Sequence, residues 1–173
     1  MKKIFIVSLL LIAVSLSAQS SIKIGFVDSQ VILAQYAPAI KAQSDLDALT
    51  AKWSKSRDSM VTVLQAQYGE YEKQKELMTA DKQRETQQAL VKKQQEIQFY
   101  EQSKFGQPNG ELYRKNEELL SPIKEKIMNS INEVAKAEGM NFIFDKTGDV
   151  LLLYADSEYD MTYKVLDKLK RGK

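Results

Sequence analysis

The residues that could do chemistry in this chain are carboxylates, amines and phenols, because its 173 residues include no Cys and no His. The absence of thiols excludes disulfide bonds, cysteine nucleophiles and thiolate metal sites. The absence of imidazole excludes a Ser-His-Asp triad, a histidine general base and a histidine-rich zinc site. An enzyme would have to use carboxylates and amines alone, and the sequence predicts no pocket-forming scaffold for them. We therefore expect no catalytic residues and no enzymatic activity.

Four aspartates at predicted strand ends and turns come closest to a metal-binding pattern. A Ca²⁺ site needs about six or more oxygen ligands, and the spacing of an EF-hand loop is absent. Aspartate is also an ordinary turn residue, because its side chain accepts hydrogen bonds from nearby backbone N–H groups. We therefore expect turn chemistry rather than a metal site, and no cofactor. The four residues are Asp28, Asp145, Asp149 and Asp156.

Residues 1–18 have the three-part pattern of a secretory signal peptide. Lys2 and Lys3 precede an apolar run at residues 4–14, and small residues lead to Ala18. The run is about 11 residues long, whereas a membrane-spanning helix needs roughly 20. No Cys follows it, which excludes a lipid-modified lipoprotein. We therefore expect an exported protein whose signal peptide is cleaved after Ala18.

Cleavage at this point changes the charge balance of the chain. The sequence has 25 Lys and Arg residues against 23 Asp and Glu residues. Without Lys2 and Lys3, 23 basic residues remain and the formal net charge of the mature chain is zero. A nucleic-acid-binding protein is expected to keep an excess of Lys and Arg to contact phosphates. Nucleic acid is therefore not an expected partner.

Strand signals occur near both ends of the mature chain. In residues 19–35, apolar side chains alternate at Ile22, Ile24 and Phe26, which predicts the first strand of a head domain. In residues 139–173, two apolar runs at 141–145 and 150–154 are separated by a turn sequence that contains Gly148, which predicts a β-hairpin.

Residues 156–170 are predicted to be helical, with Asp160 as a candidate N-cap. Its apolar side would consist of Met161, Val165, Leu166 and Leu169.

Residues 36–138 are helical in pattern and predict a hairpin arm that returns to the head. In the first limb, the apolar residues from Leu49 to Tyr71 are spaced alternately by four and seven positions, and this 11-residue repeat predicts a nearly straight stripe. A reversal is expected near 78–81, where Thr79 is a candidate N-cap, and a break near 105–110, where Pro108 interrupts the helix ladder. Gly139 is expected to end the last helix in the left-handed conformation. The first stripe is Leu49, Trp53, Met60, Leu64, Tyr71 and Met78, and the last is Leu112, Leu119, Ile123, Ile127, Ile131 and Val134.

The predicted fold class is α+β, mostly α, with a small head of three strands per subunit and a long antiparallel α-hairpin arm. A sheet of three strands is marginal alone, and the run at 150–154 is apolar on both faces. We therefore expect the head to bury its apolar residues against other copies of the chain. The oligomerisation residues would be Ile22, Ile24, Phe26, Phe142, Phe144, Leu151, Leu152 and Leu153.

The order of these elements resembles the Skp/OmpH family of periplasmic chaperones, and the resemblance covers essentially the whole mature chain. It implies a homotrimer whose strands form a central β body and whose coiled-coil-like arms enclose a cavity. It also implies a periplasmic holdase that binds unfolded outer-membrane β-barrel proteins without ATP and prevents their aggregation before membrane insertion. The matching segments are 24–28, 119–123, 127–135 with Gly139, 152–155 and 160–162.

Client binding of this kind would use many weak contacts, and Met and aromatic side chains suit it because they repack against different partners. The alternative is that these side chains pack the seam of the hairpin, and this reading is favoured for residues on the apolar stripe. The candidate client-binding residues are Tyr68, Met78, Phe99, Tyr100, Phe105 and Tyr113.

Two other functions are compatible with long paired helices. A structural coiled-coil spacer of the cell envelope is the main alternative, although the distal limb is rich in Gln and its apolar stripe is thin. A lipid-binding helix would place Lys and Arg beside a broad apolar face, which the arm lacks. Known family members are strongly basic, whereas this mature chain is neutral, so contact with membrane or lipopolysaccharide stays open.

Overall fold

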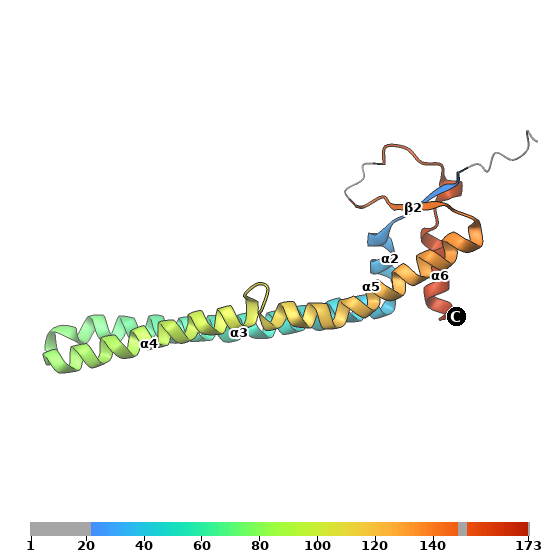
Figure 1. Ribbon diagram of the computed structural model, residues 1–173. Coiled ribbons are helices and arrows are strands. Elements are labelled where there is room, and N and C mark those ends of the chain that lie inside the picture. Colours follow the sequence, from blue (N-terminus) through green and yellow to red (C-terminus); the bar gives the residue numbers. More distant parts are fainter. Residues whose placement is uncertain (1–21, 149–151, 173) are drawn as a thin grey trace, which may run out of the picture. The chain divides into compact units, whose positions relative to one another are not determined.

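The computed structural model describes residues 22–148 and 152–172 (Figure 1). The predicted signal peptide, Asp149, Val150 and Leu151 therefore lie outside the described residues. The chain forms two compact units. The head unit combines the N-terminal part up to Ile32 with the C-terminal part from Ser130, and the arm unit comprises Leu33–Asn129.

A two-stranded parallel sheet joins the two ends of the chain in the head unit. Strand β1 (Ile24–Val27) pairs with β2 (Phe142–Asp145), so that Ile24 lies opposite Phe142 and Phe26 opposite Phe144. On the other edge of β1, the N–H of Met161 donates to the carbonyl of Phe26 at 2.8 Å. The sheet is therefore built entirely from contacts that are distant in sequence.

The described head differs from the predicted three-stranded one. Its residues form two strands, and β2 pairs with β1 in parallel instead of forming a hairpin with the following segment. Leu152, Leu153 and Tyr154, the described end of the predicted third strand, lie outside any strand and are exposed. The physical reason is that an apolar run needs cover on both faces, and the described part of one chain supplies none here.

The core of the head is formed by the C-terminal helix. Helix α6 (Thr162–Arg171) follows a single 3₁₀ turn, η2 (Ser157–Tyr159), and begins later than the sequence pattern indicates. The carboxylate of Asp160 accepts the N–H of Thr162 at 2.9 Å, although Met161 is the N-cap residue. The predicted apolar side of this helix is confirmed, because all four residues are buried: Met161, Val165, Leu166 and Leu169.

Two of the four aspartates hold local structure around the end of β1. Asp28 caps helix α2 (Ser29–Gln35), because its carboxylate accepts the N–H of Val31 at 2.8 Å. The N–H of Asp28 donates to Thr162 Oγ1 at 2.9 Å, and Lys146 Nζ lies 3.0 Å from the carboxylate. Asp28 therefore connects β1, α2, the turn after β2 and α6.

Asp145 has a similar structural role at the end of β2. Its carboxylate accepts hydrogen bonds from the N–H of Ser29 at 3.2 Å and from both the N–H and the hydroxyl of Thr147, at 3.0 and 2.8 Å. Burial raises the pKa of Asp145, but these hydrogen bonds outweigh it and the pKa is lowered. Both carboxylates therefore act as turn and cap acceptors.

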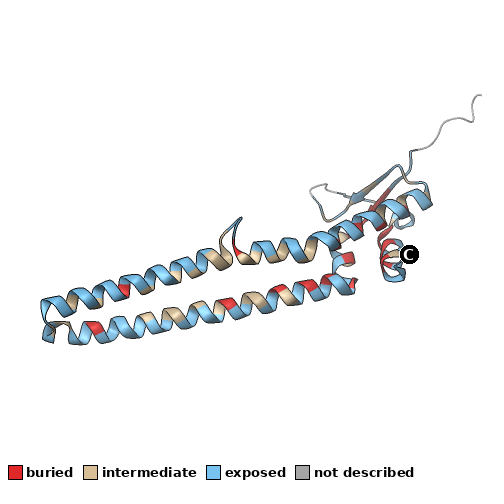
Figure 2. Ribbon diagram, turned by 60° about the horizontal axis from the view of Figure 1, so that its bottom comes forward, coloured by how far each residue is buried: buried red, intermediate tan, exposed pale blue. Residues whose placement is uncertain are grey.

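The arm unit is built from long helices. Helix α3 (Ala37–Gln74) and helix α4 (Ala80–Phe105) lie side by side and run antiparallel (Figures 1 and 2). Helix α5 (Glu111–Glu138) begins in the arm and ends in the head unit, where Gly139 adopts a φ of 67° as predicted. Few positions of the arm are buried (Figure 2), because two paired helices cover only a narrow stripe of each other.

The reversal between α3 and α4 uses a short 3₁₀ turn, η1 (Lys75–Leu77). The predicted N-cap is confirmed, since Thr79 Oγ1 accepts the N–H of Lys82 at 3.4 Å. The side-chain amide of Gln83 also donates to the carbonyl of Lys75 at 2.6 Å. These bonds satisfy backbone groups that the two helix ends leave unpaired.

A five-residue loop separates α4 from α5, and it contains Pro108. Two glycines close this loop: a Cβ on Gly106 would clash with the carbonyl of Gln102, and a Cβ on Gly110 would clash with the carbonyl of Gly106. Any other residue at these positions would force the backbone apart. The loop therefore depends on glycine at both of its ends.

The unbroken helix α3 supports the arm at the level of this loop through a cluster that we call the Trp53 cluster: Trp53, Arg57, Lys104 and Phe105. The rings of Trp53 and Phe105 meet edge to face, with centroids 6.3 Å apart. Lys104 Nζ lies 5.0 Å from the centroid of Trp53, and the Arg57 guanidinium lies 6.0 Å from that of Phe105. Lys104 also pairs with Glu111 across the loop.

Replacement of Trp53 by alanine should destabilise the arm strongly. The indole is 7 % exposed, and its loss removes the largest buried contact of the cluster. We expect Trp53→Ala to lower the free energy of unfolding by about 3 kcal/mol, measured by denaturant unfolding followed by circular dichroism. Phe99→Ala is the matched control, because Phe99 is an aromatic residue of the same arm that is 75 % exposed. Equal effects of the two substitutions would contradict the role given to Trp53.

The Asp28–Lys146 pair should make the stability of the head pH-dependent. The hydrogen bond from the Val31 N–H, together with Lys146, lowers the pKa of Asp28 below its ordinary value. A carboxyl group with a lowered pKa in the folded state stabilises the fold above its unfolded pKa, and this stabilisation is lost as pH falls through the folded pKa. Asp28→Asn keeps the capping acceptor but removes the charge.

The wild type should therefore unfold at a higher temperature than Asp28→Asn near neutral pH, and the difference should begin to shrink as the pH falls below about 4 and vanish below the folded pKa of Asp28. The measurement is the thermal midpoint between pH 2 and 7 at fixed protein concentration. Asp167→Asn, which affects only an exposed ion pair with Arg171, should give a smaller effect. A pH-independent difference for Asp28→Asn would show that the charge of Asp28 contributes nothing.

Candidate functional site

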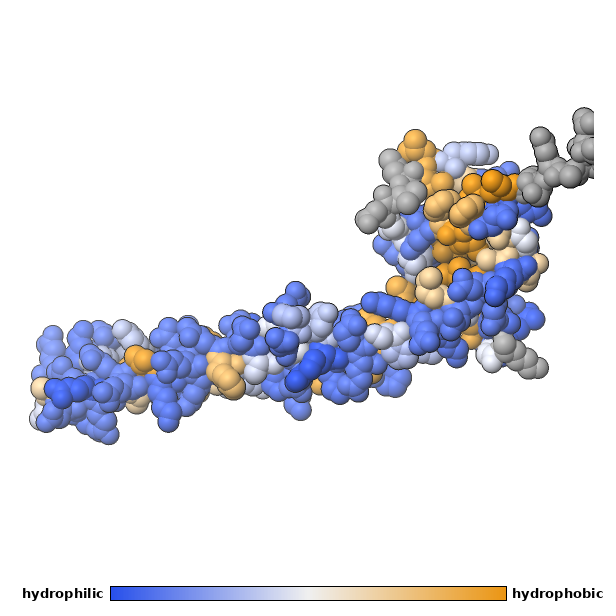
Figure 3. Space-filling model, viewed as in Figure 1, coloured by the Kyte–Doolittle hydropathy of each residue, from blue (hydrophilic) through white to orange (hydrophobic). Residues whose placement is uncertain are grey.

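The first candidate site is an exposed apolar surface on the head, which we call the head face. Ile24, Phe142 and Phe144 point to the same side of the two-stranded sheet, because alternate residues of a strand share a face and opposed residues of a pair share a side. Phe142 is 55 % exposed and Ile24 50 %. Apolar side chains gather over this part of the head unit (Figure 3).

The opposite face of the sheet is covered within the chain. A Cβ on Gly25 would lie 3.2 Å from the carbonyl of Tyr159 and 3.3 Å from the side chain of Met161. Glycine is therefore needed for the close approach of this segment, and one side of the sheet is closed. The other side carries Phe26, which is buried, and three large apolar residues that the described residues leave exposed: Ile24, Phe142 and Phe144.

The eight predicted oligomerisation residues differ in how far they are buried in the structure. Phe26 is buried within the single chain, where Lys146 Nζ lies 6.0 Å from its ring centroid. Leu151 lies outside the described residues. The other six are exposed: Ile22, Ile24, Phe142, Phe144, Leu152 and Leu153.

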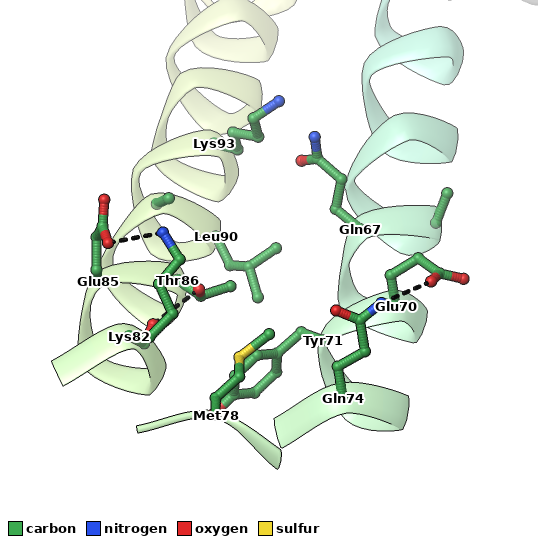
Figure 4. A pocket seen from close by; sticks show the side chains of 12 residues that line it. Gln67, Glu70, Tyr71, Gln74, Met78, Lys82, Glu85, Thr86, Leu90 and Lys93 are labelled. Atoms are coloured by element: carbon green, nitrogen blue, oxygen red, sulfur yellow. Dashed lines mark hydrogen bonds and ion pairs between the residues drawn. The ribbon is translucent and has the colours of Figure 1, made fainter. Parts of the chain in front are cut away.

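The second candidate site is a pair of grooves along the α3–α4 seam near the hairpin turn. Tyr71 and Leu90 are the buried residues of this stretch, and each groove is lined by both of them. The volumes are about 450 Å³ on one side of the seam and about 510 Å³ on the other. We call the first of these the Lys93 groove, after the lysine at one end of it (Figure 4).

The polar groups around the two grooves are mostly engaged with one another. Gln87 Nε2 donates to the hydroxyl of Tyr71 at 2.7 Å, which fixes the phenol between the helices. Lys82 pairs with Glu85 at 2.8 Å, and this ion pair lowers the pKa of Glu85. The seam therefore combines an apolar floor with a rim on which most charged groups are paired.

The candidate client-binding residues fall into three groups in the structure. Tyr68, Phe99 and Tyr113 are exposed, and Tyr68 also meets Tyr71 edge to face with centroids 6.4 Å apart. The second group consists of Met78, which lines the Lys93 groove, and Tyr100, which is half-buried.

Phe105 forms the third group, because it packs in the Trp53 cluster. This position agrees with the alternative interpretation, in which such side chains pack the seam of the hairpin. Two exposed apolar residues were not predicted from the sequence, Leu77 of the turn and Val91 of α4. Both lie off the apolar stripe. An apolar residue outside the stripe is expected to be exposed, and this pattern could have identified them from the sequence.

Within residues 22–148 and 152–172, no three acidic side chains come together in a group that could hold a metal ion. None of the helices in the same described part is long and apolar enough to cross a membrane.

The family model described as outer membrane protein (OmpH-like) matches residues 23–169 of the chain. A crystal structure of an OmpH-like protein from Caulobacter crescentus CB15, assigned as an outer membrane chaperone, has a similar fold with a TM-score of 0.71. The two chains are 14 % identical, and the similarity covers 90 % of this chain and 88 % of that chain. No protein with a curated description matches the sequence.

Proposed function

The chain belongs to the OmpH-like family of outer membrane proteins, and on that premise we propose that it is an ATP-independent periplasmic holdase chaperone. It binds unfolded outer-membrane β-barrel proteins between its helical arms and prevents their aggregation before insertion into the membrane. The arm is the observation that carries this proposal. Its paired helices enclose no core, and they present shallow grooves and exposed aromatic side chains along their length.

An unfolded client exposes scattered apolar side chains in no fixed arrangement. Many weak contacts with such side chains give a large combined affinity when they act within one assembly. Tyr68, Phe99 and Met78 offer contacts of this kind, because aromatic and thioether side chains adapt to different partners. Binding by such contacts needs no nucleotide, since no step requires an input of energy.

We further propose that the chain assembles through the head face into a homotrimer. Large exposed apolar residues concentrated on one side of a two-stranded sheet are unfavourable in a monomer and mark an interaction surface. The copy number rests on the family resemblance. Three arms held by one body would surround a client and supply the multivalency that the binding mode requires.

The oligomeric proposal predicts that Phe142→Asp lowers the molecular mass. A buried charge at the subunit interface would oppose association, so this variant should elute as a monomer, whereas the wild type should have the mass of a trimer. Light scattering of the mature chain after chromatography provides the measurement. Phe99→Asp makes the same change at a more exposed arm position and should stay trimeric. A monomeric wild type would exclude self-association, and a trimeric Phe142→Asp would exclude the head face as the interface.

The chaperone proposal predicts that the mature protein suppresses aggregation of a urea-denatured outer-membrane β-barrel protein after dilution. Light scattering of the client should fall nearly to background at a molar excess of chaperone, without ATP. Phe142→Asp should lose most of this effect, because single arms lose multivalency.

Undiminished aggregation with the wild type would contradict the proposal and favour a structural spacer of the cell envelope. Binding to lipid vesicles without an effect on the client would instead favour a lipid-binding protein.

A further inference from the structure

The Lys93 groove is an unfilled hollow of the α3–α4 seam. Two of the residues that line it are alanines, Ala66 of α3 and Ala89 of α4, so the space beside Tyr71 and Leu90 stays unfilled. Its volume of about 450 Å³ lies within the range of about 300–1,000 Å³ that is usual for ligand pockets. The groove is thus large enough for one bulky side chain of another molecule.

The charged residues that line this groove differ in whether they form ion pairs. Lys82 and Glu85 form an ion pair with each other, and Glu70 accepts from Lys73 at 3.1 Å. Lys93 forms no ion pair with any residue of the described chain. It is therefore the one charged lining residue that is available, within the described part of the molecule, for an external anion.

The position of Lys93 sets the distance between that anion and the apolar floor. Lys93 and Leu90 are three residues apart on α4, and residues at this spacing are neighbours on a helix surface. Figure 4 shows Lys93 and Gln67 at one end of the groove, Leu90 in the middle, and Tyr71 and Met78 at the other end. A suitable ligand therefore carries a carboxylate within about one helical turn of a bulky apolar side chain.

On these grounds, and resting on the proposed chaperone function, we propose that the Lys93 groove binds the C-terminal residue of an unfolded client when that residue is large and apolar. In a C-terminal residue, the α-carboxylate and the side chain are attached to the same Cα atom. Both groups can therefore enter the groove together. In an extended segment, a side-chain carboxylate on the adjacent residue points to the opposite side, and one on the next residue but one lies about 7 Å further along the chain. Lys93 would pair with the α-carboxylate, and Tyr71, Met78 and Leu90 would contact the side chain.

The test uses the assembled mature protein and a fluorescent 12-residue peptide that ends in Phe with a free carboxylate. The same peptide with a C-terminal amide is the comparison, and binding is measured by fluorescence anisotropy. The free acid should bind about three- to five-fold more tightly than the amide, as expected for an exposed charge pair. Raised salt should reduce this preference.

Two substitutions and a control assign the effect to the groove. Lys93→Gln should abolish the preference for the acid and leave binding of the amide unchanged. Ala89→Leu, which fills the groove with a residue that favours helix, should weaken binding of both peptides. Lys92→Gln removes a lysine from the same helix that does not line the groove, so it should behave as the wild type.

Equal binding of the acid and amide peptides to the wild type, or an unchanged acid preference in Lys93→Gln, would overturn the groove proposal. Suppression of client aggregation decides the chaperone proposal separately, since Lys93→Gln leaves the other contacts of the arm intact. A wild type that suppresses aggregation but does not distinguish the peptides would thus be a chaperone without a C-terminus site. A wild type that distinguishes the peptides but does not suppress aggregation would support the groove proposal and contradict the holdase proposal.

Discussion

Two α-helices packed against each other can cover only a narrow stripe of each other's surface, and this limit determines the character of the arm. Trp53 and Tyr71 lie on the stripe and are buried, while Phe99 of the neighbouring helix is 75 % exposed. A third layer that would cover such residues is absent from the described seam of α3 and α4. Exposed aromatic residues are therefore a direct consequence of the architecture, and the proposed client contacts use what the helix pair cannot bury.

The head joins the two ends of the described chain, which are separated in the sequence by the whole arm. The parallel pairing of β1 and β2 and the network around Asp28 do this with contacts between residues more than 100 positions apart. Helix α6 supplies a core on one side of the sheet, with Met161 and Val165 fully buried. Because a parallel sheet is normally covered on both faces, the exposed residues of the head face support the proposed subunit interface.

Local signals in the sequence were sufficient for the features that depend on a few adjacent residues. Thr79 caps a helix and Gly139 ends one in the left-handed conformation, as their own chemistry requires. The absence of a strand at Leu152–Tyr154 could not be predicted, because strand formation depends on a neighbouring strand to pair with, which a local sequence pattern does not specify. The Lys93 groove was also beyond prediction, since it requires the coincidence of Ala66 and Ala89 on two helices whose register the sequence pattern leaves undetermined.

The charge distribution explains why contacts on the arm should be short-ranged. Most arm ion pairs join residues three or four positions apart on one helix, such as Lys41 with Asp45 and Lys82 with Glu85, so positive and negative charges alternate over short distances. At physiological ionic strength such a surface has little field beyond a Debye length of about 8 Å. A client held as proposed would therefore be attracted little from afar and retained by apolar contact. Under these conditions the proposed pairing of Lys93 with a client carboxylate would have a selective effect that a uniformly basic surface would conceal.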